Sequence, residues 1–267
     1  MTSAKEFLDE GRLAAAIERL TQDVKARPAD VASRIFLFEL LCFAGDLDRA
    51  EKQLDVVAHQ SLDMEAGTSI YRHALAAERM RRKVFDEGAL PAFLTAPPEH
   101  AALHVEALSL QRENEPGKAR ALLSKSLEVQ PSVSGQVDGR PFEEFEDSDL
   151  FIGPFLELFV RDRYVWLPFE EIRSIQVGKP RHLRDLIWTQ AKLEGIAGDI
   201  GEVLLPVLYP GTSSHSNESI KLGRMTDWVD IGEGLARGVG QRLFMIDGEE
   251  RAMLQLNAIN FNVTGRQ

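Results

Sequence analysis

The sequence contains a single cysteine, Cys42, among 267 residues, and only 7% of its residues are aromatic. One cysteine cannot form a disulfide within the chain or build a thiolate metal cluster, so nothing indicates an oxidising compartment. No run of eighteen apolar residues occurs, and the opening MTSAKEFLDEGR lacks the apolar stretch of a secretion signal. We therefore expect a cytoplasmic protein that is neither exported nor inserted in a membrane.

Basic side chains are also few, because 31 Lys and Arg face 42 Asp and Glu, for a formal net charge of −11. A duplex nucleic acid held by phosphate neutralisation is therefore not an expected partner. Part of the acidic excess lies in PSVSGQVDGRPFEEFEDSD, residues 131–149. Because the prolines and glycines of this stretch interrupt helices, we predict an acidic linker here, between domains at 1–130 and 150–267.

The first 130 residues contain a repeat of 34 residues. Two copies begin at Gly11 and Gly45, and a looser third copy begins at Asn114. The copies share an alanine and then a leucine at equal offsets: Ala16 and Leu20, Ala50 and Leu54, Ala119 and Leu123. Small residues at this period are typical of tetratricopeptide-like helix pairs, whose helices cross closely. The sequence therefore predicts a tetratricopeptide-like α-α superhelix over residues 1–130.

The apolar periodicity of this region predicts helices at 3–10, 13–26, 30–44, 47–60, 65–86, 99–114 and 116–129. Between residues 35 and 43 the only polar side chain is Glu39. Such a helix is either covered by its neighbours on most sides or lines a groove that accepts a partner helix. In the second case we expect Arg34, Phe38 and Tyr71 to contact the partner.

Residues 150–267 have the pattern of short strands separated by glycine and proline. Leu156, Leu158 and Val160 alternate with other side chains, which is the period of a strand, and Asp247-Gly248 is a favourable two-residue hairpin turn. We predict a mostly antiparallel sheet or small barrel, so the fold class is α+β. The polar stretch PGTSSHSNES, residues 210–219, is expected to be a mobile loop.

Residue patterns that carry chemistry are weak in this sequence. His100 and His104 have the spacing of two metal ligands on one helix face, but no third ligand accompanies them. Ser213, Ser214 and His215 are adjacent in a polar loop, without the strand-to-helix elbow that exposes a nucleophilic serine. We predict no catalytic residue, no metal and no cofactor, so the chain is not expected to be an enzyme. A hydrolase is the remote alternative.

Two further features have open interpretations. Arg79, Arg81, Arg82 and Lys83 lie at a predicted helix C-terminus, where they either complement the helix dipole or form a basic docking patch. Charged pairs also accompany aromatic residues in the second half of the chain. These residues brace the sheet or anchor a partner, because Trp, Tyr and Arg are enriched at interface hot spots. They are Arg184, Asp185, Trp188, Tyr209, Arg224, Asp227 and Trp228.

Several of these residues belong to motifs that resemble the ImpE family, also called TagJ. The motifs are Asp147-x-Asp149, Gly153-Pro154, Pro180, RDLIW at 184–188, GEV at 201–203, PVLYPG at 206–211 and LGRMTDW at 222–228. In combination they are specific, and the resemblance extends over essentially the whole chain, including the helical repeats.

The resemblance implies a bacterial cytoplasmic accessory component of the type VI secretion system. Its implied partner is the small subunit of the contractile sheath, which it helps to assemble or recycle, and it implies no reaction. A general helical-repeat scaffold for another cytoplasmic complex is the alternative. The oligomeric state is left open.

Overall fold

The computed structural model describes residues 2–60 and 62–262, apart from the side chains of residues 62–64 and 66. The helices are α1 (Ala4–Asp9), α2 (Leu13–Ala26), α3 (Val31–Phe43), α4 (Leu47–Ala58), α5 (Leu62–Arg82), α6 (Glu99–Arg112), α7 (Pro116–Val129) and α8 (Glu218–Lys221). Helix α5 continues into a π-helical turn, η1 (Lys83–Glu87). These bounds confirm the predicted helical region. No helix in the described part of the chain could cross a lipid bilayer.

The second half of the chain forms antiparallel sheets. The strands are β1 (Gly135–Val137), β2 (Arg140–Phe142), β3 (Phe145–Asp147), β4 (Phe155–Val160), β5 (Arg163–Pro168), β6 (Ile172–Val177), β7 (Trp188–Gly195), β8 (Gly198–Pro206), β9 (Thr226–Gly232), β10 (Leu235–Gly240), β11 (Leu243–Ile246), β12 (Glu249–Ala252) and β13 (Ala258–Phe261). The largest sheet has the order β2-β1-β13-β6-β7-β8-β4-β5, and two small sheets have the orders β10-β9 and β12-β11-β3. The predicted α+β class with a mostly antiparallel sheet is confirmed.

The repeat determines how the first helices meet. Gly11 and Gly45 have φ angles of 78° and 77°, a left-handed conformation that suits glycine, and each ends one helix just before the next begins. The repeated alanines, Ala16, Ala50 and Ala119, are each 0% exposed, which lets the paired helices approach closely. The 34-residue pattern therefore identifies real helix pairs.

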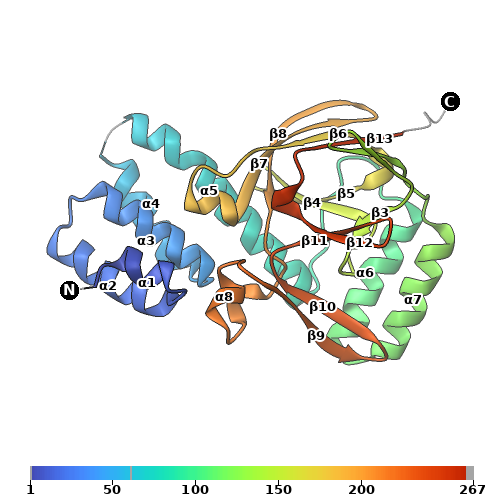
Figure 1. Ribbon diagram of the computed structural model, residues 1–267, viewed down its shortest axis with the longest axis horizontal. Helices are drawn as coiled ribbons and strands as arrows, with labels where there is room; N and C mark the ends of the chain where they lie inside the picture. Colours follow the sequence, from blue (N-terminus) through green and yellow to red (C-terminus); the bar gives the residue numbers. More distant parts are fainter. Residues whose placement is uncertain (1, 61, 263–267) are drawn as a thin grey trace.

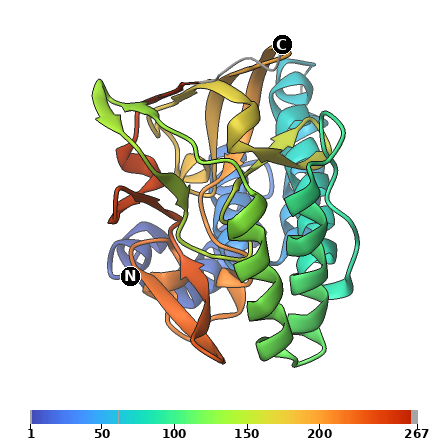
Figure 2. The same cartoon turned by 90° about the vertical axis from the view of Figure 1, so that its right-hand side faces the viewer.

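The helix pairs do not form one continuous array. Figure 1 shows α1–α4 at one end of the molecule and α6 and α7 at the other, with α5 and the sheet between them. Figure 2, viewed from the α7 end, shows α6 and α7 side by side in front of the strands. Helix α6, which pairs with the third repeat copy in α7, packs against the sheet: its His104 ring contacts Phe155 on β4 and donates a hydrogen bond to the Phe151 carbonyl (3.0 Å). The repeat pattern indicates which helices form a pair, but it does not indicate which pair lies next to which. The sequence alone therefore predicted one superhelix.

The predicted acidic linker is wrong, because residues 131–149 are folded. They form β1, β2 and β3, and Val137, Phe142 and Phe145 are each at most 5% exposed. The Phe142 and Phe145 rings lie 5.4 Å apart, and Phe145 also packs against Phe169 and Phe244. The exposed acidic side chains that suggested a linker lie in the connections between these strands, at Asp138, Glu143 and Glu144, whereas Asp147 and Asp149 are buried.

We predict that glutamyl endopeptidase leaves residues 143–146 uncut under native conditions. Cleavage at Glu143, Glu144 or Glu146 requires β2 and β3 to leave their sheets, which costs a substantial part of the free energy of unfolding. Mass spectrometry of a native digestion time course should therefore show these bonds cleaved only in urea. Two stable fragments that separate at this segment without denaturant would restore the linker interpretation.

Candidate partner-binding site

Three predicted contact residues meet where the helical end joins the strands. Helix α3 supplies Phe38, α5 supplies Tyr71, and the short helical turn η3 (Leu183–Leu186) supplies Arg184. The Arg184 guanidinium lies over the Tyr71 ring at 4.7 Å, and its Nη1 donates to Glu39 Oε1 at 2.8 Å. Burial raises the pKa of Glu39, and the ion pair with Arg184 opposes that effect. The segment between β6 and β7, which carries Arg184, thus covers part of the surface of α3 and α5.

Helix α3 is neither a fully covered core helix nor an open groove wall. Its C-terminal half, Leu37–Phe43, is buried, whereas Val31, Ile35 and Phe36 near its N-terminus are half-buried. Arg34 donates from Nε to the Pro28 carbonyl (2.8 Å) and from Nη1 to Gln53 (2.9 Å). The N-terminal half therefore presents apolar side chains at helical spacing, held in place by Arg34.

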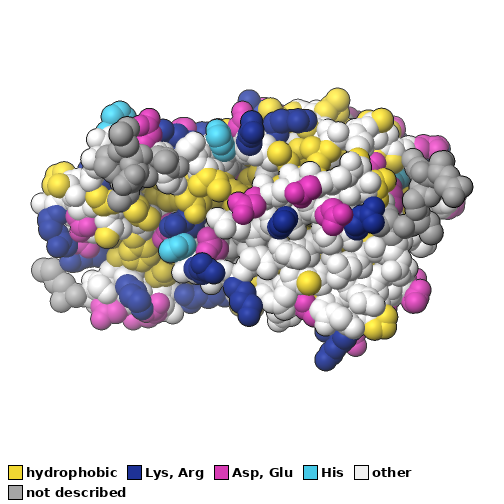
Figure 3. All heavy atoms as spheres, turned by 90° about the horizontal axis from the view of Figure 1, so that it is seen from above, with side chains coloured by type: hydrophobic (Ala, Val, Ile, Leu, Met, Phe, Trp, Pro, Cys, Tyr) yellow, Lys and Arg dark blue, Asp and Glu magenta, His cyan; other side chains and the backbone are white. Residues whose placement is uncertain are grey.

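A basic cavity of about 360 Å³ lies beside Tyr71 and Arg184, which contact Phe38 and Glu39 of α3. Lys179, Arg181 and His182 line it together with Tyr71 and Arg184. Asp185 shapes the wall, because its carboxylate accepts hydrogen bonds from the backbone N–H groups of Arg181 (2.8 Å) and His182 (2.9 Å). Figure 3 shows hydrophobic side chains over the helical end of the molecule, bordered by basic, acidic and histidine side chains.

Three of the predicted contact residues are buried and offer no surface to a partner. Phe38, Trp188 and Tyr209 are each 1% exposed. Phe38 packs against Tyr71, and the Trp188 indole N–H donates to Glu78 at 3.3 Å. These three aromatic rings pack inside the protein, so they are core residues and not interface anchors.

The residues of the LGRMTDW motif, 222–228, have structural contacts of their own. Arg224 donates to the Leu8 carbonyl (2.6 Å) and the Asp9 carbonyl (3.1 Å) at the end of α1. Asp227 accepts a hydrogen bond from the backbone N–H of Trp228, whose half-buried ring lies 5.8 Å from that of Tyr209. Arg184 and Asp185 do not pair with each other among the described contacts, and neither do Arg224 and Asp227. Each of these side chains binds another group instead.

The polar stretch 210–219 is not a free loop. Its Thr212 hydroxyl donates to the Tyr209 carbonyl (2.6 Å) and accepts from the Gly240 N–H (2.8 Å). Glu218 accepts a hydrogen bond from the Ala14 N–H at the start of α2 (2.8 Å), which places a carboxylate at a helix N-terminus. Ser213 lies so close to Gly45 that a side chain there would be 2.5 Å from its hydroxyl. This stretch therefore packs against both repeat turns, Gly11 and Gly45, through residues 213–224.

A buried cluster of charged side chains joins α5 to the sheet. Arg81, at the end of α5, donates from Nε and Nη2 to the two carboxylate oxygens of Glu157 on β4 (2.8 and 2.9 Å). Arg242 bridges Glu157 and Asp147, and all four side chains are at most 3% exposed. Arg81 is thus a structural tie, and its neighbours Arg79 and Arg82 bind Glu51 and the Gly45 carbonyl. These contacts contradict a basic docking patch.

The two carboxylates of this cluster have opposite pKa shifts. For Glu157 the cost of burial is outweighed by Arg81 and Arg242, which lower its pKa to about 2. Burial raises the pKa of Asp147 to about 7, because the charge of Arg242 offsets only part of the cost of burial and the carboxylates of Asp149 and Glu157 raise the pKa further. The Tyr209 hydroxyl donates to Asp147 (3.0 Å), and Arg237 pairs with Asp149 (2.8 Å). Asp147 and Asp149 belong to one of the sequence motifs, but no local pattern indicated that they are buried partners of Arg242 and Arg237.

The histidine pair is also part of the core. His104 has its Nδ1 3.0 Å from the Phe151 carbonyl, which can only accept, so this nitrogen carries the proton. Its Nε2 then accepts from the Ser126 hydroxyl at 2.8 Å. Both His100 and His104 contact the Phe155 ring. Across the described residues no group of three His, Cys, Asp or Glu side chains could hold a metal ion.

We predict that Glu157→Gln lowers the free energy of unfolding by about 3–5 kcal/mol, because it leaves two buried guanidinium groups with one counter-charge fewer. Urea denaturation followed by circular dichroism measures the loss. The matched control is Asp9→Asn, which breaks an exposed i,i+4 pair with Lys5 and should leave the transition unchanged. Equal effects of the two substitutions would show that the buried cluster contributes no more than a surface pair.

We predict that His104 makes the protein less stable as the pH falls. Burial lowers the His104 pKa to about 4, below its ordinary 6.5, so between these values the unfolded chain binds the proton and the folded chain does not. The stability is complete above pH 6.5 and is lost toward pH 4, by about 3 kcal/mol. His104→Gln should remove this loss in urea titrations at successive pH values, whereas exposed His73→Gln should not. Parallel pH dependences of wild type and His104→Gln would contradict the assignment.

The comparisons with known proteins agree with both halves of this architecture. Residues 7–76 match a tetratricopeptide repeat family, and residues 139–260 match the family described as ImpE protein. The fold is that of a crystal structure from Vibrio parahaemolyticus, with a TM-score of 0.90, 25% identity and 97% of each chain covered. The chain is 38% identical to the type VI secretion system accessory component TagJ of Pseudomonas aeruginosa, over 98% of this chain and 92% of the relative. This chain therefore belongs to the ImpE family, as its sequence motifs indicated.

Proposed function

We propose that this protein is a cytoplasmic adaptor of the type VI secretion system that binds the small subunit of the contractile sheath and supports its assembly or recycling. The observation that carries the proposal is the 38% identity to an accessory component of that system, which extends over 98% of this chain. The helical repeats support a binding role, because stacked helix pairs expose an extended face that accepts peptides and helices.

The binding face in this proposal is the N-terminal half of α3 together with the basic cavity beside Tyr71 and Arg184. Val31 and Ile35 are spaced by one helical turn, and Phe36 lies beside them, so an amphipathic helix can place apolar side chains against them. Lys179 and Arg181 at the cavity favour acidic residues on the same partner helix. Arg34, Tyr71 and Arg184 remain contact candidates at the rim, whereas Phe38 supports Tyr71 from beneath.

The alternative function is a scaffold for a different cytoplasmic complex that uses the same helical face. It differs from the proposal only in the identity of the partner. Affinity purification from the native cell separates the two, because sheath subunits should be recovered with this protein only if the proposal is correct.

We expect the purified sheath small subunit to bind the full chain with a dissociation constant of roughly 1 μM, about 8 kcal/mol. Ile35→Glu and Arg181→Glu should each weaken binding at least tenfold in isothermal titration calorimetry, because they place a charge on the apolar contact or reverse the cavity charge. The matched control is Val229→Glu, at a 43% exposed apolar residue on β9.

Thermal melting of each variant separates lost contact from lost folding, and Arg181 is exposed enough for its substitution to leave folding intact. Absence of binding by the wild-type chain would overturn the sheath partner. Binding that survives both substitutions would move the interface to another face and leave the partner in place.

A further inference from the structure

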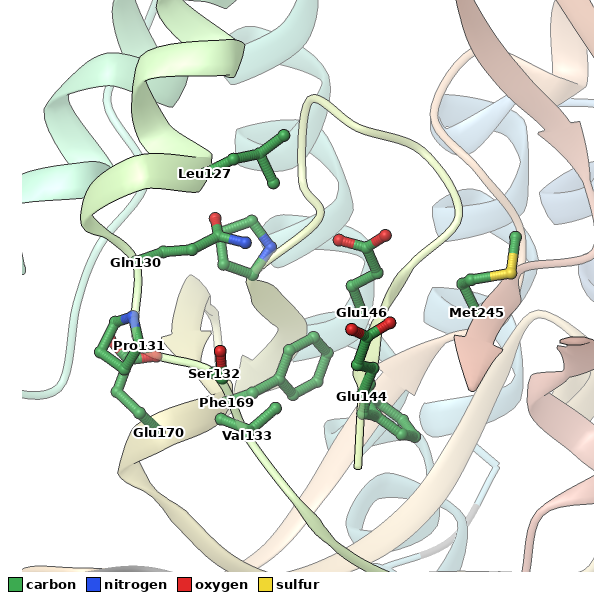
Figure 4. Close-up of a pocket in the computed structure, with 12 residues that line it drawn as sticks. Leu127, Gln130, Pro131, Ser132, Val133, Glu144, Glu146, Phe169, Glu170 and Met245 are labelled. Carbon is green, nitrogen blue, oxygen red and sulfur yellow. The ribbon is translucent and has the colours of Figure 1, made fainter. Parts of the chain in front are cut away.

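A second surface lies at the other end of the molecule, where α7 ends beside β3. Residues 131–133, the end of α7 and the strand β3 enclose a cavity of about 260 Å³ (Figure 4). Its apolar lining includes Val133, Phe169 and Met245. Leu127, at its upper edge in the figure, is 57% exposed, which is high for a leucine on a packed helix. Phe169 belongs to the core and forms the floor of this cavity, whereas Leu127 makes the rim available to a partner.

The cavity has an acidic wall. Glu144, Glu146 and Glu170 line it, and no lysine or arginine does so among the described lining residues. The Glu144 and Glu146 side chains lie next to each other on the β3 side of the cavity in Figure 4. Within residues 2–60 and 62–262, neither of these two carboxylates has a hydrogen bond or an ion pair. Burial, followed by the charge of Glu144, raises the pKa of Glu146.

The edge of β3 that faces away from β11 is only partly paired: the Asp147 N–H on this edge bonds the Gly153 carbonyl (2.8 Å), and Phe145 lies beyond it beside the acidic wall. β3 is the last strand in the order β12-β11-β3, so β11 is its only neighbour in that sheet. The Ser148 N–H bonds the Leu243 carbonyl (3.1 Å), and the Asp247 N–H bonds the Glu144 carbonyl (3.2 Å). Because backbone groups alternate in direction along an antiparallel strand, the Phe145 N–H and carbonyl face the opposite edge. Phe145 itself lines the cavity.

We propose that this acid-walled groove binds a short extended segment of a partner protein, in which lysine or arginine alternates with apolar residues, as an added strand on β3. In an extended segment, alternate side chains point to opposite faces. Basic side chains then reach Glu144 and Glu146, while apolar side chains cover Leu127 and Val133. Strand addition satisfies the free backbone groups at Phe145. The groove does not depend on the sheath-binding face, so this interaction stands apart from the proposed function.

The test uses a fluorescein-labelled peptide of sequence VKVRVK, acetylated and amidated at its ends, with the full-length wild-type chain at low salt. We expect saturable binding in fluorescence anisotropy and chemical-shift changes at Phe145 and Glu146 in amide NMR spectra. The charge-reversed peptide VEVEVE should bind at least tenfold more weakly. A VKVRVK peptide with N-methyl groups on alternate residues should also lose binding, because it cannot pair with the strand edge.

The matched variants separate the groove from general attraction to an acidic protein. The double substitution Glu144→Gln and Glu146→Gln should weaken binding of VKVRVK at least tenfold, whereas Glu249→Gln and Glu250→Gln on the exposed strand β12 should not. Equal losses in the two double variants, no binding by wild type, or shifts at a different surface would each overturn the proposal. Equal binding of the N-methylated peptide would exclude strand addition.

Discussion

The arrangement of this protein depends on two arginines buried against two carboxylates. Removing Arg81, Arg242, Glu157 and Asp147 from water is costly, and their attraction offsets that cost only while the hydrogen bonds are well aligned. The cluster therefore allows very few positions of α5 relative to β4. Since α3 packs beside α5 and receives Arg184 from the strand region, the geometry of the helical face follows from the same charges.

The polar segment after β8 makes the helical repeats depend on the strands. Glu218 supplies a carboxylate to the N-terminus of α2, and Arg224 supplies a cation to the C-terminus of α1. These are the favourable ends of two helix dipoles, and both contacts come from more than 200 residues away in the sequence. Neither helix needs a complete local cap, because a distant part of the chain provides one.

Local pattern was sufficient for the helices, the repeat and the fold class. Gly11 and Gly45 identified the repeat turns, and Asp247-Gly248 occurs in the turn between β11 and β12 with both φ angles positive. The pattern failed at 131–149, where strands of three residues are too short to show alternation and the acidic residues between them resemble a linker. It also failed at the charge cluster, whose partners are 76 to 95 residues apart in the sequence. The residues around Trp188 and Tyr209 in the sequence do not indicate whether these two side chains are buried in the core or exposed at an interface.

Helix α5 is shared by the helical repeats and the sheet, because its last two residues tie it to both: Arg82 binds the Gly45 turn and Arg81 binds Glu157 on β4. A partner on the helical face and a peptide on β3 would therefore be held at a fixed separation and a fixed angle. With a flexible connection, a second binding event gains only from a raised local concentration, whereas a rigid one also selects partners by their spacing. Partners bound at the helical face and at β3 would then be selected by the spacing between their own binding segments.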